Sequence, residues 1–524
     1  MPNDFRASDL VQLSLTPRDW SRIYPLWRPA KVRILAYADG PVALDGGSFQ
    51  GLQHVFSVLK SNTYSYVKFE PQFAHRDGTD PSATISGAKK LTDLDILNNY
   101  DEIWFFGFNA GQSLDAAELT ALDQFMSAPK SGGILVTGDH ANLGQGLAGQ
   151  IKRAGKMRKY PAPNNVAPGW NTTLVEGSDP NATYDFNDQS DDVPQKIRWR
   201  RYDLAGGLVL LNRFRPHPVL CGPDGPIDVF PDHQHEGEAL APLPAAGDTA
   251  WPSKAGHQEI PQVIAWGRIK DPAATQYGNE IGVLSAYDGH TVDVGRIVAD
   301  STWHHWFDIN LIGLPFDATY AGFDATLAGQ AALKNINAFF LNVGVWLAPP
   351  ERQQAMRNAA WWNILWTDRI VELTTSVSKA SIYWLGEQAI DALGRVASRC
   401  SVSEWTLDLP DFKPKIPKWE WPQLFGKFER VNFPLEAFAA GGILRRLIQD
   451  VVLRDQKIIV PRELPDAALN RLIEQGATEG LSELSSQLKR ELHSAMELVG
   501  SRLDFRGTGT ATAAHDKTLT TVES

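Results

Sequence analysis

Short apolar runs alternate with amphipathic stretches over most of the first two thirds of the chain. Strands are expected over residues 31–39, 64–73, 101–108 and 134–137, and helices over residues 52–60 and from an N-cap at Ser113 to just before Pro129. Strands and helices that alternate in this way are typical of a doubly wound, mainly parallel sheet. The pattern therefore predicts an α/β fold of the flavodoxin-like kind.

Regular patterns become sparse after residue 154 and return further along the chain. Residues 263–268, 281–286 and 295–299 have strand patterns, and the last two flank a turn-rich segment that predicts a hairpin. A helix over residues 330–347 is expected to close this domain, and Pro349 and Pro350 mark a boundary. We therefore predict an α/β domain over residues 1–348, a Trp-rich helical domain over residues 349–505 and a disordered tail over residues 506–524.

Composition narrows the class of protein. The formal net charge of −11 argues against a protein that holds nucleic acid through phosphate contacts. No apolar run approaches the ~18 residues of a membrane span, and the N-terminus lacks the apolar core of a secretory signal. The two cysteines, Cys221 and Cys400, lie far apart in sequence, which favours a reducing compartment over a disulfide framework. We expect a cytoplasmic protein, and we interpret Cys221 as a small buried hydrophobe.

The stretch from Gly133 to Gly146 carries the first candidate chemistry. Asp139 and His140 follow the carboxyl end of a predicted buried strand, before a helix-like run over residues 147–154. Ligands of open α/β sheets bind outside the carboxyl ends of the strands. The two side chains are therefore candidates for an acid–base pair or for metal ligands. The alternative is structural, with Asp139 capping the next helix and His140 packed.

A second candidate is the polar segment around His233 and His235. In an extended segment these two side chains point the same way, so they can offer two imidazoles to one ion. Asp232 and Glu236 are possible additional ligands or supporting acids. The segment therefore predicts a divalent metal site, with Zn, Mn or Fe as the ion. The alternatives are a polar loop with solvated histidines, or histidines that only hydrogen-bond to a substrate.

A third candidate is the segment from Asp300 to Asp308, which follows a predicted strand and contains His304 and His305. A serine nucleophile at Ser301 is disfavoured because no G-x-S-x-G elbow surrounds it. Two adjacent histidines on a helix cannot both face one site, so one of them is expected in the core. The other polar residues assigned to the pocket are Asp39, Asn109, Asp300 and His290.

A basic run lies close to the first candidate stretch. Its members are Lys152, Arg153, Lys156, Arg158 and Lys159. The run could recruit an anionic substrate, but a solvated face is the favoured interpretation.

Several segments together resemble the class I glutamine amidotransferase-like superfamily, and within it the trehalose-utilisation (ThuA-like) branch. They read KVRILAYADG, YDEIWFFGFN, GGILVTGDHANLG, HPVLCGP and GRIVADSTWHHW, and they span residues 31–347. The resemblance implies a flavodoxin-like sheet and, through the ThuA-like branch, a carbohydrate-type substrate. Amidotransferases carry a nucleophilic Cys at a strand–helix elbow, where this chain has Gly138, Asp139 and His140. Glutaminase activity is therefore not expected.

Two functional hypotheses follow. In the first, the chain is a hydrolase or lyase that acts on a small polar substrate by acid–base chemistry, with metal assistance at the His233 segment. Asp139 and His140 would be the acid–base pair, and His304 or His305 would complete the wall of the pocket. In the second, the α/β domain is a non-catalytic scaffold, and the Trp-rich helical region binds a partner or forms a homo-oligomer.

Overall fold

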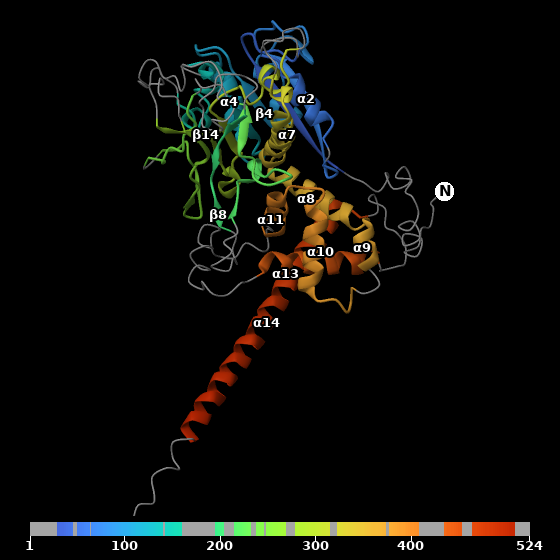
Figure 1. Ribbon diagram of the computed structural model, residues 1–524. Helices are drawn as coiled ribbons and strands as arrows, with labels where there is room; N and C mark the ends of the chain where they lie inside the picture. Colours follow the sequence, from blue (N-terminus) through green and yellow to red (C-terminus); the bar gives the residue numbers. More distant parts are fainter. Residues whose placement is uncertain are drawn as a thin grey trace, which may run out of the picture.

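A long sheet, a compact group of helices and one projecting helix make up the molecule, as Figure 1 shows. The computed structural model describes residues 29–45, 50–62, 64–139, 142–159, 194–203, 214–231, 237–245, 248–268, 278–314, 322–373, 377–407, 434–452 and 464–508. None of the helices in these ranges is long and apolar enough to cross a bilayer.

The central sheet has nine strands in the order β3-β2-β1-β4-β5-β15-β14-β13-β7. Their bounds are β1 (Ala30–Ala38), β2 (Val67–His75), β3 (Ile85–Ala88), β4 (Glu102–Phe106), β5 (Gly133–Val136), β7 (Arg198–Trp199), β13 (Gln262–Arg268), β14 (Glu280–Tyr287) and β15 (Ile297–Asp300). The strands from β3 to β15 in this order are parallel, and β14, β13 and β7 each pair antiparallel with the preceding strand.

Alternation along β1 places two apolar layers on opposite faces of the sheet, since successive strand side chains point to opposite faces. Val32, Ile34 and Ala36 belong to one buried cluster, and Leu35 and Tyr37 belong to another. The first face carries α2 (Gln53–Lys60), α6 (Asp308–Leu311) and α7 (Leu327–Leu347). The second carries η3 (Leu91–Asp93), α3 (Ile96–Asn99), α4 (Ala116–Met126), α5 (Gln145–Ala148) and η4 (Ala154–Lys156).

Short elements fill the connections around the sheet. They are β6 (Pro194–Lys196), β8 (Tyr202–Asp203), β9 (Phe214–Arg215), η5 (Pro218–Leu220), β10 (Val229–Pro231), β11 (Ser253–Lys254), β12 (His257–Gln258), η6 (Gly289–Val292) and η7 (Phe323–Ala325). Three small antiparallel pairs form among them, β10 with β6, β11 with β12 and β8 with β9.

The helical region follows α7 directly and shares its core with the sheet. Its elements are α8 (Pro350–Ile364), α9 (Asp368–Leu373), α10 (Ile382–Gly394), α11 (Arg399–Leu407), α13 (Leu435–Leu447), η10 (Ile448–Val452) and α14 (Asp466–Thr508). Trp361, Trp362 and Trp405 are buried in the same cluster as the first face of the sheet. The ring of Trp405 meets that of Tyr66 edge to face at 4.9 Å. These tryptophans therefore hold the two regions together.

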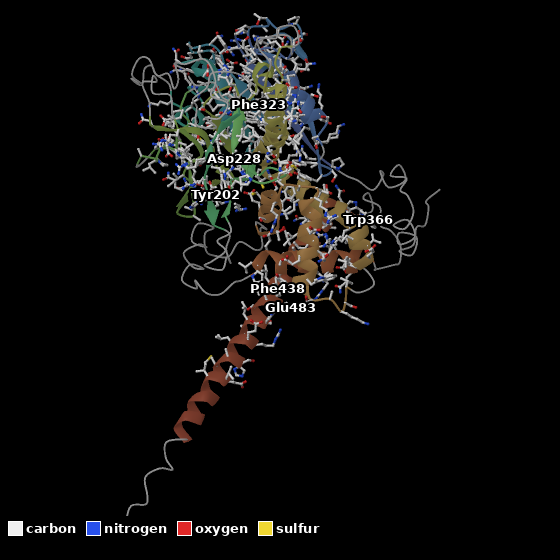
Figure 2. All side chains as sticks on the ribbon, viewed as in Figure 1. Tyr202, Asp228, Phe323, Trp366, Phe438 and Glu483 are labelled. Carbon is white, nitrogen blue, oxygen red and sulfur yellow. The ribbon has the colours of Figure 1, made fainter. Side chains whose placement is uncertain are left out.

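The first half of α14 packs closely on α13 because glycines meet at their crossing. A Cβ at Gly442 would lie 2.0 Å from the carbonyl oxygen of Gly476, so neither backbone could carry a side chain there. Figure 2 shows Phe438 and Glu483 close together where α14 leaves the group of helices. Glu483 forms an ion pair with Arg445 of α13 at 3.3 Å. Beyond this point α14 projects away from the body (Figure 1).

The predicted α/β fold with a mainly parallel sheet and a helical C-terminal region is confirmed. Three local predictions were wrong. The cap of α4 is Asp115, whose carboxylate accepts the N–H of Ala117 and Glu118, while Ser113 bonds elsewhere. The helix expected over residues 147–154 is the shorter α5, and residues up to Thr508 of the predicted tail continue α14. Residues 509–524 lie outside the described part of the chain.

Candidate functional site

The carboxyl edge of the parallel strands brings four predicted site residues to one side of the sheet. Asp39 follows β1, Asn109 follows β4, Asp139 follows β5 and Asp300 ends β15. The pairings Ala38 with Phe106, Phe105 with Val136 and Val136 with Ala299 set these strand ends level with one another. The location that sequence alone assigned to these residues is therefore where the sheet places them.

Asp139 and His304 form a buried pair at this edge. His304 Nε2 lies 3.6 Å from Asp139 Oδ2, and the two side chains are 4% and 1% exposed. Thr302 donates its hydroxyl to Asp139 Oδ1 at 3.2 Å. The same hydroxyl oxygen accepts the backbone N–H of His304 at 3.0 Å. One threonine thus fixes both members of the pair.

Asn310 determines which nitrogen of His304 can exchange a proton with Asp139. His304 Nδ1 lies 3.0 Å from Asn310 Oδ1, and an amide oxygen only accepts hydrogen bonds. Nδ1 therefore donates to Asn310 in either charge state of the ring. The lone pair or the second proton is left on Nε2, which faces Asp139. This geometry allows His304 to take up or release a proton at Nε2.

His305 occupies a different environment, although it follows His304 directly. Its Nδ1 lies 3.0 Å from the Asp300 carboxylate, which also accepts the indole N–H of Trp306 at 2.9 Å. The ring of His305 stacks on Phe230 with 4.4 Å between centroids. His305 and Asp300 are fully buried. The expectation that one of the two histidines belongs to the core is met by His305.

Arg158 joins the two strand ends that carry these pairs. Its guanidinium donates to the carbonyl oxygens of Asp139 and Ser301, the latter from Nη2 at 2.7 Å. Glycines on either side leave room for it, since a Cβ at Gly138 would lie 2.7 Å from Arg158 Cζ and one at Gly237 2.2 Å from Nη2. A fixed buried cation therefore lies directly behind the Asp139 backbone.

The interpretation of the basic run as a solvated face was wrong for two of its members. Arg153 and Arg158 are buried, and Arg153 donates to the carbonyl of Ala250 at 2.9 Å. Lys152, Lys156 and Lys159 form ion pairs with Asp123, Asp248 and Glu238 in more open surroundings. Both arginines reach inward and donate to backbone carbonyl oxygens, which need hydrogen-bond donors when they are buried.

Asp39 shapes the loop that follows β4. Its Oδ1 accepts the N–H of Phe108 at 2.6 Å and that of Asn109 at 3.0 Å, and its Oδ2 accepts the Ser113 hydroxyl at 3.2 Å. Burial raises the pKa of Asp39 above its ordinary value, although these hydrogen bonds act in the opposite direction. The ring of Phe108 stacks on Trp303 at 4.8 Å, so the loop also contacts the segment that carries His304.

The structure does not bring every predicted residue to this edge. His290 lies in η6, after the carboxyl end of β14, and β14 runs antiparallel to β15. His290 is therefore at the opposite edge of the sheet, and its assignment to the pocket was wrong. His140, Asp232, His233, His235 and Glu236 lie outside the described residues. Within the described ranges, no group of three or more His, Cys, Asp or Glu side chains is arranged to hold a metal ion.

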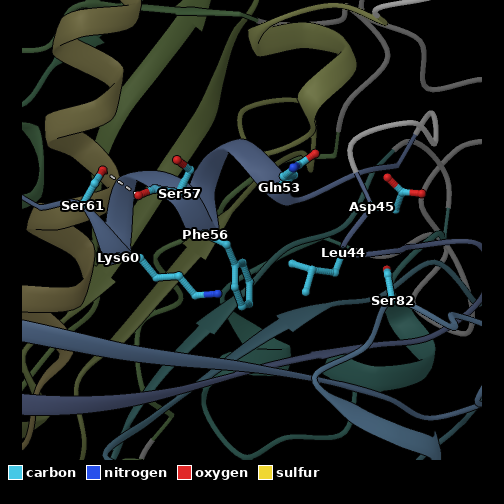
Figure 3. Close-up of a pocket in the computed structure, with 8 residues that line it drawn as sticks. All are labelled: Leu44, Asp45, Gln53, Phe56, Ser57, Lys60, Ser61 and Ser82. Atoms are coloured by element: carbon cyan, nitrogen blue, oxygen red, sulfur yellow. Dashed lines mark hydrogen bonds between the residues drawn. The ribbon is translucent and has the colours of Figure 1, made fainter.

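A surface pocket lies beside α2 and not at the Asp139–His304 pair. It has a volume of about 570 Å³, and Figure 3 shows its lining from Leu44, Asp45, Gln53, Phe56, Ser57, Lys60, Ser61 and Ser82. None of these residues was predicted for the site. Because the lining lacks a buried acid–base pair, the candidate chemistry stays with Asp139 and His304.

Three contributors to the site were missed by sequence reasoning. Thr302 and Asn310 are short polar residues near the two histidines, and only the turn from residue 301 to residue 307 shows that they contact His304. Their closeness in sequence to His304 was the one available signal. Arg158 gave no signal, since a basic run is usually solvated.

Comparisons with protein-family models, with curated proteins and with solved structures give no match for this chain.

Proposed function

We propose that the chain is an enzyme of the hydrolase or lyase type, which acts on a small polar substrate through proton transfer at Asp139 and His304. The observation that carries the proposal is the buried pair itself, with 3.6 Å between His304 Nε2 and Asp139 Oδ2 at the carboxyl edge of the sheet. A positioned imidazole beside a carboxylate is a common arrangement for general acid–base catalysis.

The order of the parallel strands supports this location. The strands β2, β1, β4, β5 and β15 follow the flavodoxin-like order 2-1-3-4-5 when numbered along the chain, with β3 added at the edge. In such sheets the ligand crevice opens where the strand order reverses, here between β1 and β4. Asp39 and the N–H groups of Phe108 and Asn109 lie at that point. The substrate would bind at this switch point and reach His304.

The neighbouring residues take supporting roles in this proposal. Thr302 and Arg158 position Asp139, and Asn310 leaves Nε2 of His304 available for proton transfer. Asp300 holds His305 within the core, and this second pair supports the turn that carries His304. These are positioning residues, because their contacts are with the pair and its backbone.

Metal assistance and the substrate class belong to the same proposal. Gly237 directly follows the segment with His233 and His235, and its N–H donates to the carbonyl of Ser301 at 3.1 Å. The residue that follows the predicted metal-binding segment thus lies beside the site. A divalent Zn, Mn or Fe ion held there would polarise a substrate oxygen or a water. The ThuA-like resemblance supports a carbohydrate-type substrate.

Hydrolysis assays with matched variants test the proposal. The parent, Asp139→Asn and His304→Gln would be assayed on p-nitrophenyl glycosides, carboxylic esters and phosphate esters, with His290→Gln as the control at the other edge of the sheet. We expect one substrate class to be turned over by the parent and the control, and hardly by the two site variants. Equal turnover by all four proteins would overturn the assignment.

Elemental analysis tests the metal separately. Protein purified without a His tag would be compared with a His233→Ala/His235→Ala double variant. Near-stoichiometric Zn, Mn or Fe in the parent and its loss from the variant would support the metal site. A metal-free parent, even after reconstitution, would remove the metal and leave the acid–base pair as the proposal.

A second function is favoured by the projecting half of α14, which could join two copies of the chain. Leu492, Met496 and Val499 are 64%, 65% and 58% exposed. They share one helix face with Leu484 and Leu488, which pack on Ile382 and Phe438 of the body. The stripe thus continues an interface already formed within the chain, and its surrounding charges are of both signs, which suits a second copy.

Light scattering on the full chain tests self-association. A dimer in the parent and a monomer in a Leu492→Glu/Val499→Glu variant would support the scaffold function. A monomeric parent at high protein concentration would exclude it. Among the tryptophans of the described helical region, Trp384 on α10 is 42% exposed and the others are buried, so they do not contribute to a binding surface.

A further inference from the structure

Glu102, the first residue of β4, is a buried acid that the proposed reaction does not use. Its side chain is fully buried, and its Oε2 accepts the indole N–H of Trp104 at 2.8 Å. Its Oε1 is also buried and has no hydrogen-bond partner. Both oxygens of an ionised carboxylate accept hydrogen bonds, so a single neutral donor satisfies only one of them.

Apolar packing surrounds this carboxyl group. Ile34 of β1 and Gly133 of β5 lie level with Glu102 on the two neighbouring strands. A Cβ at Gly133 would lie 2.2 Å from the carbonyl oxygen of Leu347, so the end of α7 packs directly on the sheet at this level. Trp104, two residues along β4, belongs to the apolar cluster between the sheet and the helices of its first face. Solvent therefore does not reach the acid.

The charged groups on the elements around Glu102 have other partners. Arg33, Lys130 and Arg352 bind Asp101, Lys31 binds Glu70, Lys334 binds Asp224, Arg296 binds Asp288, Arg357 binds Asn470, and His304 and His305 pair with Asp139 and Asp300. Glu351 at the start of α8 is exposed and lies 3.8 Å from Arg352. Within the described part of the chain, no cation forms an ion pair with Glu102.

An ionised Glu102 would thus be a buried charge with one neutral donor. Burying a lone carboxylate costs far more than burying a neutral acid, so the group takes up a proton instead. Because an indole N–H only donates, Oε2 remains the accepting oxygen and the proton lies on Oε1. Burial raises the pKa of Glu102 well above its ordinary value, the hydrogen bond from Trp104 lowers it, and the charge of Asp101 raises it further.

Trp104 also connects this acid with the candidate site. Its ring meets that of Trp306 edge to face, with 5.5 Å between centroids. The indole of Trp306 donates to Asp300 at 2.9 Å, and Asp300 holds His305 on the turn that also carries His304. The carboxyl group of Glu102 therefore belongs to the packing that supports this turn.

We propose that Glu102 is a carboxylic acid in the folded protein at neutral pH and a pH-sensitive element of the fold, whose ionisation destabilises the packing of Trp104 on the turn of residues 301–307. The folded state binds this proton more tightly than the unfolded state does. The stabilisation is therefore complete below the unfolded pKa of a glutamate, about 4.3, and is lost as the pH rises through the folded value. Glu102 thus acts in the opposite direction to an acid that is paired with cations.

Urea unfolding of the full chain at several pH values tests the proposal. In Glu102→Gln, the amide oxygen still accepts the Trp104 N–H, and the side chain does not titrate. The unfolding equilibrium constant of the parent, divided by that of the variant, should rise about tenfold per pH unit from about pH 5 to pH 7. Glu351→Gln is the control, because an exposed glutamate should give a ratio that is constant over this range. A constant ratio for Glu102→Gln as well would overturn the proposal.

A second variant and a spectroscopic measurement separate the proton from packing. Glu102→Met also does not titrate, so it should show the same dependence on pH, with a lower stability throughout because the Trp104 N–H loses its acceptor. The infrared spectrum of the parent at pH 7 in heavy water, minus that of either variant, should contain the C=O band of a carboxylic acid. Carboxylate bands in that difference would overturn the proposal. Either variant serves as the reference, so the measurement remains decisive if one of them fails to fold.

Discussion

Buried carboxylates occur at both edges of the sheet, and their partners differ in kind. At the amino edge, Asp101 precedes β4 and binds three cationic side chains, from Arg33 at 3.1 Å, Arg352 at 3.3 Å and Lys130 at 3.5 Å. At the carboxyl edge, Asp39 accepts hydrogen bonds from two backbone N–H groups and a hydroxyl. Asp139 lies opposite an imidazole and a threonine hydroxyl.

This difference in partners changes what each carboxylate can do. Burial acts to raise the pKa of Asp101, but the hydrogen bonds from Arg33 and the charges of Arg352 and Lys130 outweigh it, so the pKa is lowered. Asp39 has a raised pKa because burial outweighs its neutral donors. A carboxylate beside permanent cations stays ionised. A carboxylate beside neutral donors or a histidine can still exchange a proton. The carboxylate at the amino edge therefore stabilises the fold, and those at the carboxyl edge are suited to proton transfer.

The largest expected effect is on catalysis. Asp139→Asn and His304→Gln should each lower the turnover of the substrate class identified in the assays by about 100–10,000-fold, the usual contribution of a general acid or base. Asp101→Asn should leave turnover unchanged. Steady-state kinetics of the three variants would measure this, and similar losses in all three would mean that the two edges do not differ in function.

Arg158→Met should cause the largest loss of stability at the carboxyl edge. It removes the guanidinium donor of the Asp139 and Ser301 carbonyl oxygens, and the Ser301 oxygen keeps only the N–H of Gly237, so the expected cost is about 3 kcal/mol in the free energy of unfolding. Arg153→Met is the matched control, since that buried arginine donates to the Ala250 carbonyl. Urea unfolding of both variants should show the greater loss for Arg158→Met.

Asp101→Asn should destabilise the protein at neutral pH by about 3 kcal/mol, because it leaves a group of cations without their carboxylate. The lowered folded pKa means that Asp101 contributes stability above its unfolded pKa and loses it as the pH falls through the folded value. The variant should therefore differ most from the parent at pH 7 and least in acid. Thermal unfolding at several pH values would measure the difference in stability between parent and variant. A difference that does not change with pH would contradict the prediction.

Asp39→Asn should change the free energy of unfolding by less than Asp101→Asn does, and in the opposite direction. The folded pKa of Asp39 lies above its unfolded value, so the folded state binds the proton more tightly and the parent loses stability as the pH rises through that interval. Asparagine keeps the oxygen that accepts the Phe108 and Asn109 N–H groups and does not titrate. The stability of the variant should rise relative to that of the parent as the pH increases above the unfolded pKa of an aspartate, about 4, in the same thermal unfolding series.

Short apolar runs were enough to predict β1, β4, β5 and the β14–β15 hairpin, because strands buried on both faces are apolar over most of their length. The position of Asp139 followed from the rule that parallel strands end at one edge. The edge strand β3 was missed because Ile85–Ala88 is short and mostly exposed, so it has little apolar pattern.

Contacts between distant segments could not be predicted in the same way. Arg158 resembles its solvated neighbours in sequence, and only the glycines at residues 138 and 237 make room for it in the interior. Such contacts depend on how the elements pack, which the periodicity of a single element does not encode.

The projecting helix has a hydrodynamic consequence. At about 1.5 Å per residue, the 43 residues of α14 extend for roughly 65 Å, whereas a compact chain of this length would have a radius of gyration of about 24 Å. Friction depends on the longest dimension, so the monomer should tumble anisotropically and elute from a sizing column ahead of a spherical protein of equal mass. A method that measures molar mass, such as light scattering, is therefore needed to distinguish this elongated monomer from a dimer.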